Sequence, residues 1–124
     1  MKKSIFTALL SLVAIVGVAF ASLPLTRPTI MVNPTEMVVR PNMPFTITAA
    51  FTNANRFFVF MNDPRTSGSE IFLTDDMKNC PDMQMIECTF VTTETVLLWF
   101  YVYSIDESVY SFDCTFCRVE PSDI

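Results

Sequence analysis

The chain has 124 residues, of which 51% are hydrophobic and 13% aromatic, and its formal net charge is −5 at pH 7. This length allows one domain with a single modest core. The acidic balance disfavours binding to nucleic acid and to anionic lipid, because a negatively charged surface repels phosphate groups.

The first 21 residues predict a secretory signal peptide. Lys2 and Lys3 give a positive start, an apolar run follows over residues 5–20, and Ala19 and Ala21 form a small-x-small cleavage site. We expect cleavage after Ala21, since the run is shorter than a membrane-spanning helix. The mature chain would then hold six cations and thirteen acidic residues, a net charge of −7. No later run is long enough to span a membrane, so the sequence predicts a secreted, extracellular protein, periplasmic or at the cell surface if the source is bacterial.

The mature chain is predicted to be all-β. Residues 22–35 carry three prolines and predict an extended leader or a short edge strand, residues 36–119 predict the folded domain, and residues 120–124 form a polar tail. Runs rich in Phe, Val, Thr and Tyr alternate with turn residues and predict strands. These runs cover residues 36–40, 44–52, 56–62, 70–73, 84–92, 96–104 and 108–119. Seven or eight short, mostly antiparallel strands favour a single small β-sandwich, Ig-like or jelly-roll-like, with a small barrel as the alternative.

The four cysteines of the mature region predict disulfide bonds, because an even count in a secreted chain is typical of them. They are Cys80, Cys88, Cys114 and Cys117. The Cys114-x-x-Cys117 spacing lies in an alternating strand pattern with no helix after it, which disfavours a thioredoxin-like site. The absence of histidine and the Cys80–Cys88 spacing disfavour zinc.

Strand parity gives a preference among the pairings. An offset of three puts Cys114 and Cys117 on opposite faces of a straight strand, so they are not expected to bond to each other. Cys114 shares its face with Tyr110, Phe112 and Phe116, and we expect that face to point inward together with Cys88. The parity therefore favours Cys88–Cys114 in the core and Cys80–Cys117 near one end. The local alternative, Cys80–Cys88 with Cys114–Cys117, stays open.

Two of the predicted strands are apolar on both faces. In residues 56–61 and 96–103 phenylalanines, tyrosines and aliphatic side chains occupy odd and even positions alike, whereas a sandwich strand meets the core with one face only. The second face could be covered by the proline-rich leader or the loop over residues 74–83, or its tyrosines could tolerate water. Alternatively it binds a protein partner or a second copy of the chain. The residues predicted for such a surface are Phe57, Val59, Trp99, Tyr101 and Tyr103.

Catalysis is not expected from this residue set. The chain has no histidine to act as a general base, no nucleophile-elbow or metalloprotease motif, and only Gly68 among its glycines follows the signal peptide. No enzyme activity and no cofactor are therefore predicted. Asp75, Asp76 and Asp82 are a weak calcium candidate, but they lack the EF-hand pattern and surround Lys78, so a solvated acidic loop is favoured.

The succession PFTITAAF, RFFVFMNDPRTSGSE and ETVLLWFYVYSIDESVYSFDCTF, within residues 36–118, resembles bacterial pre-peptidase C-terminal domains. In that family a strand ends near Asp-Pro and a late aromatic strand is followed by a second strand with a tyrosine. This chain has Phe57-Phe58-Val59-Phe60 where the family has an acidic-Leu-Tyr core. The resemblance implies a small jelly-roll or Ig-like sandwich used as a secreted accessory or binding module. An immunoglobulin domain proper is disfavoured, because Cys114 follows Trp99 too closely.

Together these features predict a small secreted, non-catalytic binding module that acts through an aromatic β-surface. Two alternatives remain at this stage. One is a secreted effector, toxin or inhibitor that disables a target protein, and the other is a structural coat or matrix component.

Overall fold

The structure, a computed structural model, describes residues 27–120 and contains eight strands and no helix in that range. The predicted signal peptide lies outside the described residues. The strands are β1 (Thr29–Asn33), β2 (Glu36–Val39), β3 (Phe45–Thr52), β4 (Arg56–Met61), β5 (Ser69–Ile71), β6 (Gln84–Phe90), β7 (Val96–Tyr103) and β8 (Tyr110–Val119). The all-β prediction is confirmed, and every predicted strand is present within three residues of its expected ends.

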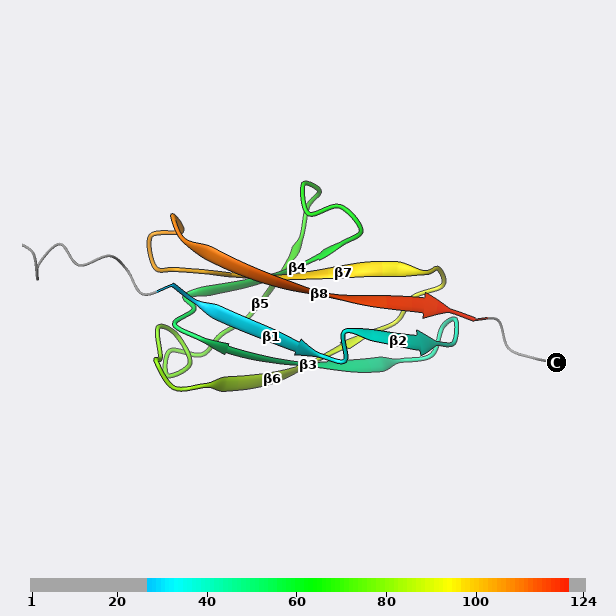
Figure 1. Cartoon of the computed structure of the whole chain (residues 1–124), viewed down its shortest axis with the longest axis horizontal. Helices are drawn as coiled ribbons and strands as arrows, with labels where there is room; N and C mark the ends of the chain where they lie inside the picture. Colours follow the sequence, from blue (N-terminus) through cyan, green and yellow to red (C-terminus); the bar gives the residue numbers. More distant parts are fainter. Residues whose placement is uncertain (1–26, 121–124) are drawn as a thin grey trace, which may run out of the picture.

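The strands form two sheets that lie one over the other, as Figure 1 shows. The smaller sheet has the order β1-β3-β6, and the larger has the order β2-β8-β7-β4-β5. Neighbouring strands run antiparallel, except that β2 pairs with β8 in parallel. Two packed β-layers are the arrangement of a sandwich, in agreement with the predicted fold class.

The hydrophobic core lies between the two sheets. Phe51, Phe57 and Phe100 are almost completely buried there. The Phe57 ring makes edge contacts with both of the others, at centroid distances of 5.5 Å to Phe51 and 6.3 Å to Phe100. Strand β7 contributes its alternate residues Leu98 and Val102 to the same layer, both fully buried.

Asparagines close several of the connections between strands. Asn42, Asn53, Asn62 and Asn79 have positive φ, between 54° and 64°. Asparagine adopts this left-handed conformation more readily than most residues, because its short polar side chain can bond to the nearby backbone. Three of these asparagines lie in separators that the sequence marked as turns, after residues 40, 52 and 61.

The chain changes sheets between its first two strands. Strand β1, which falls within the predicted leader, is an edge strand of the smaller sheet, and β2 joins the larger sheet after a cis peptide bond between Asn33 and Pro34. The segment from Pro28 to Pro34, which we call the leading segment, runs beside the inner face of β8. It therefore belongs to the sandwich itself and does not cover an outer face.

Three polar side chains of β8 hold the leading segment in place. Ser111 donates a hydrogen bond to the Pro28 carbonyl, and Thr115 donates one to the Pro34 carbonyl at 2.8 Å. Between them, Asp113 accepts a hydrogen bond from the Val32 backbone N–H at 2.9 Å. These side-chain bonds satisfy backbone groups of the leading segment in place of strand-to-strand hydrogen bonds, since buried backbone groups need partners.

Thr115 gives a direct test of this arrangement, because its side chain is completely buried. Thr115→Val keeps the shape but leaves the Pro34 carbonyl without its partner, so we expect the free energy of unfolding to fall by about 1 kcal/mol. Urea denaturation of the variant and the parent measures the difference. Thr89→Val, at an exposed threonine on the outer face of β6, is the control. An equal loss in both variants would contradict the proposed role of the Thr115 hydroxyl.

Candidate functional site: an aromatic outer face on the larger sheet

The outer face of the larger sheet is covered by aromatic rings. Every second residue of β4, β7 and β8 points to this side, and the strand register places them in rows across the sheet. In one row Phe58, Tyr101 and Phe112 lie next to one another, and in the next row Phe60 lies beside Trp99. We call the aromatic face the set Phe58, Phe60, Trp99, Tyr101, Tyr103, Tyr110, Phe112 and Phe116.

The rings of the aromatic face other than Phe116 contact one another as a continuous layer. Tyr101 is at its centre, with stacked contacts to Phe112 at 5.2 Å and to Tyr103 at 6.1 Å, and an edge contact to Phe60 at 5.3 Å. Trp99 contacts Phe112 at 5.6 Å. Contacts of this kind stabilise the rings beyond the effect of burying apolar area. The rings therefore restrain one another's conformations.

The layer nevertheless remains open to solvent. Phe112 is 50% exposed, Tyr110 46% and Phe116 40%, while the other members are half-buried by their neighbours. Within residues 27–120, neither the proline-rich leader nor the loop over residues 74–83, the two segments considered as covers for a second apolar face, lies over it. Strand β1 lies in the opposite sheet, and the loop over residues 74–83 is bonded to the turn after β3, where Asn79 donates to the Ala54 carbonyl.

The outer face of the smaller sheet has a different composition. It carries threonines in cross-strand pairs, with Thr29 bonded to Thr52 and Thr46 bonded to Thr89. Glu87 lies on the same side of β6. Met31 and Met85 are also exposed on this side, but no aromatic ring of β1, β3 or β6 lies there. Such a mixed face is typical of a sheet surface in contact with water. The contrast within one small domain marks the aromatic face as a distinct surface.

Charged residues lie at the edges of the aromatic face and not at its centre. At the β5 edge Arg56 donates hydrogen bonds to Glu70 and to Glu107, and its guanidinium lies 4.8 Å from the centre of the Phe58 ring. The hydrogen bond with Glu70 raises the pKa of Arg56 and lowers the pKa of Glu70. At the β2 edge Arg118 pairs with Glu120. The face is thus an apolar centre with a paired charged rim.

Two tyrosines of the face are partly withdrawn from water. Burial raises the pKa of Tyr101 and the pKa of Tyr103, and the neighbouring Tyr110 adds to both shifts. Trp99 is held from one side, because its indole N–H donates to the Asn62 carbonyl at 2.9 Å. The face is therefore ordered before any partner binds, which reduces the entropy lost on association.

The structure divides the predicted surface residues between two faces. Trp99, Tyr101 and Tyr103 lie on the aromatic face, but Phe57 and Val59 point into the core, with exposures of 0% and 7%. The register explains this division, since Phe58 and not Phe57 is the cross-strand neighbour of Tyr101. Sequence reasoning missed Phe58, Phe60, Tyr110, Phe112 and Phe116 as surface residues. The apolar residues on both faces of β4 were the available signal for Phe58 and Phe60, whereas the alternation along β8 predicted an inward aromatic side.

The expected direction of β8 was wrong. Tyr110, Phe112 and Phe116 were predicted to point inward with Cys114, but they point outward, and Ser111, Asp113, Thr115 and Cys117 point inward instead. The reason is the leading segment. Its backbone groups lie against the inner face of β8, and only polar side chains can satisfy them.

The predicted disulfides are not formed, because all four cysteines are free thiols in the structure. Cys88 is buried in the core, whereas Cys114 lies on the opposite, outer side of the larger sheet beside Trp99. Cys80 lies by the turn after β3, where its carbonyl accepts from Asn53, and Cys117 is buried beside Val96. That turn is next to Tyr103, at the other end of β7 from Val96, so Cys80 and Cys117 are far apart.

The free thiols also differ from an activated redox site. Burial raises the pKa of Cys114 and of Cys117, and it raises the pKa of Cys88 to about 11. A reactive thiol needs the opposite shift, since the thiolate is the nucleophile. Within residues 27–120 no group of three or more His, Cys, Asp or Glu side chains is placed to hold a metal ion. Asp75, Asp76 and Asp82 are accordingly not brought together as a calcium site.

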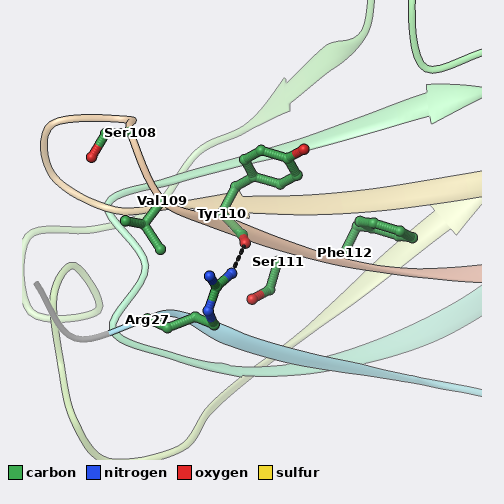
Figure 2. Close-up of a pocket in the computed structure, with 6 residues that line it drawn as sticks. All are labelled: Arg27, Ser108, Val109, Tyr110, Ser111 and Phe112. Carbon is green, nitrogen blue, oxygen red and sulfur yellow. Dashed lines mark hydrogen bonds between the residues drawn. The ribbon is translucent and has the colours of Figure 1, made fainter.

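A shallow pocket lies at the start of β8, beside the aromatic face. Figure 2 shows Arg27 reaching the backbone of Tyr110, while the Tyr110 ring points the other way. The guanidinium donates to the Tyr110 carbonyl at 2.7 Å. Strand β2 pairs with β8 only from Phe116 onward, so Arg27 occupies part of an otherwise unpaired strand edge.

No protein family and no curated protein matches the chain. A solved structure that it resembles is a superoxide reductase (neelaredoxin) from Ignicoccus hospitalis, at 12% sequence identity and a TM-score of 0.46. The similarity covers 82% of this chain and 86% of that protein. The described part of the chain holds no helix that could cross a membrane.

This neighbour is an enzyme, and it contradicts the predicted function of a non-catalytic binding module together with its effector and coat alternatives. That prediction is therefore withdrawn. At this similarity the neighbour assigns no reaction and no substrate to the chain. The absence of enzyme activity, the secretion of the chain and its family resemblance stay predictions.

Proposed function

We propose that the aromatic face is a self-association surface, and that the protein acts as a homodimer in which two copies pack these faces together. One observation carries the proposal, namely a layer of aromatic rings that is exposed, ordered and free of charge at its centre on one side of the sandwich only. Exposed apolar patches of this kind mark interaction sites in soluble proteins.

The area of the face is compatible with a second copy of the domain as the partner. The five strands of the sheet have 4, 10, 8, 6 and 3 residues, and at about 3.3 Å per residue and about 4.8 Å between strands they give a face of roughly 490 Å². Two such faces would bury about 1,000 Å², which is the size at which a biological interface becomes plausible and is typical of a weak or transient one. Aromatic side chains are also the residues most enriched at the centres of interfaces.

The charges favour a second copy as the occupant. The chain is acidic overall, yet each edge of the face carries a cation and an anion, Arg56 with Glu70 on one side and Arg118 with Glu120 on the other. A face with both signs at both rims is complementary to itself in a two-fold arrangement. Because two acidic copies repel each other at long range, added salt should strengthen the association.

We infer, further, that the sandwich is of the immunoglobulin type. With β1, β3 and β6 as strands A, B and E, and β8, β7, β4 and β5 as G, F, C and C′, both sheet orders follow that arrangement. The D strand has no counterpart between β5 and β6. The chain lacks the buried tryptophan and cysteine pair of antibody domains, since Trp99 lies on the outer face.

The test is sedimentation velocity over a wide range of concentrations, applied to the parent and to two charged variants. Phe112→Asp introduces a carboxylate in the aromatic face, and Met85→Asp introduces one at a similarly exposed apolar residue on the other sheet. We expect the parent and Met85→Asp to dimerise and Phe112→Asp to remain monomeric. A parent that stays monomeric at every concentration, or equal behaviour of the two variants, would overturn the proposal.

A further inference from the structure

The protein contains three tyrosines, and the fold brings all of them together. Tyr101 and Tyr103 come from β7 and Tyr110 from the start of β8. The ring centroids are 5.7 Å apart for Tyr101 and Tyr110, 5.7 Å for Tyr103 and Tyr110, and 6.1 Å for Tyr101 and Tyr103. Every tyrosine is therefore in contact with both of the others.

The register places one pair directly opposite each other across the two strands. Tyr103 pairs with Tyr110, and in the adjacent pair the Ser104 backbone N–H donates to the Val109 carbonyl at 2.8 Å. Tyr103 and Tyr110 therefore form a non-hydrogen-bonded pair, in which side chains approach most closely. Tyr110 is 46% exposed in the single chain, so an external oxidant can reach it in the monomer.

From this cluster we propose that the tyrosines are a site of oxidative cross-linking, at which Tyr110 forms a dityrosine bond with Tyr103 or Tyr101 of the same chain. The oxidant is a haem peroxidase with hydrogen peroxide. Each of two phenols gives up one electron and one proton, and one hydrogen peroxide accepts both pairs and becomes two water molecules. The two phenoxyl radicals join through a carbon–carbon bond ortho to the oxygens, and each ortho hydrogen then moves to its phenolic oxygen.

The surroundings favour coupling within the chain over other fates of the radicals. Stacked contacts with Phe112 and Tyr103 restrain the Tyr101 ring, and the edge contact with Phe58 restrains Tyr103. Rings already held in contact react as a unimolecular pair, without the entropy cost of an encounter. The product links β7 to β8 covalently. This inference does not depend on the homodimer, because all three rings belong to one copy.

The experiment treats dilute protein with a haem peroxidase and hydrogen peroxide, then cleaves it after glutamate residues. Cleavage at Glu107 separates Tyr101 and Tyr103 from Tyr110, so a bond to Tyr110 leaves two peptides joined, with the mass of both less two hydrogen atoms. We expect the joined peptide in the parent, in Tyr101→Phe and in Tyr103→Phe, and its loss in Tyr110→Phe. Each change removes one hydroxyl from an exposed or half-buried ring, and circular dichroism checks the fold.

Two results would overturn the proposal. One is dityrosine found only in covalent dimers on a denaturing gel, which would mean that coupling occurs between molecules. The other is a parent chain without the joined peptide although its tyrosines are consumed. Sedimentation of the untreated protein reports on the homodimer separately, so failure of one proposal is distinguished from failure of the other.

Discussion

Phe57→Ala is expected to lower the free energy of unfolding by about 3–5 kcal/mol, the usual cost of removing a large ring from a packed core. Phe57 is completely buried, and its ring bridges the two sheets through edge contacts with Phe51 and Phe100. A loss of this size is a large part of the stability of a domain of about 100 residues. Chemical denaturation followed by tryptophan fluorescence measures it.

The matched control is the adjacent residue on the same strand. Phe58→Ala removes a ring of the same size from the aromatic face, where solvent already reaches it. Its effect on the stability of the monomer should be a small fraction of the Phe57 effect, while its effect on self-association should be the larger of the two. If the two variants lost similar stability, the assignment of inner and outer faces on β4 would be wrong.

Alkaline pH is expected to destabilise the reduced protein through its buried thiols. Burial raises the pKa of Cys88 to about 11, from an ordinary value of 9.0. The unfolded chain therefore releases this proton at a lower pH than the folded chain does. The stabilising contribution is complete below pH 9 and is lost as the pH rises through about 11. Allowing for solvent screening, Cys88 alone accounts for roughly 1–2 kcal/mol.

Denaturation in the presence of a reductant, repeated between about pH 8 and about pH 11.5 to bracket both pKa values, checks this expectation. Cys88→Ala should have a shallower alkaline fall than the parent, whatever its stability at neutral pH. Cys80→Ala, at a half-buried loop cysteine, is the control for removal of a thiol as such. Parallel curves for the parent and Cys88→Ala would show that this thiol does not ionise on unfolding.

The strands could be predicted from the sequence because turn-forming residues mark their boundaries. Asparagine and proline punctuate runs of phenylalanine, valine and threonine, and those runs became strands. The faces could not be predicted in the same way. In β4 and β7 both parities are apolar, so the choice depends on which strand lies opposite, and that pairing joins residues about 40 apart in sequence.

Strand β8 shows why a clear pattern can still mislead. Its alternation of Tyr110, Phe112 and Phe116 with Ser111, Asp113 and Thr115 predicts an aromatic inner side, as in an ordinary half-exposed strand. The inner side is polar here because the segment from Pro28 to Pro34 presents its backbone to it. The local sequence of β8 gives no indication that the segment from Pro28 to Pro34 lies against it. The misplaced face also accounts for the incorrect pairing of Cys88 with Cys114.

The parallel pairing of β2 with β8 has a mechanical consequence. The start of β1 and the end of β8 lie at opposite ends of the long axis of the domain (Figure 1). A pull between these ends draws β2 and β8 past each other along their length. The four residue pairs from Glu36↔Phe116 to Val39↔Val119 then carry the load together in shear and do not open one after another. We therefore expect the domain to resist stretching along this axis more than strands that open from one end would.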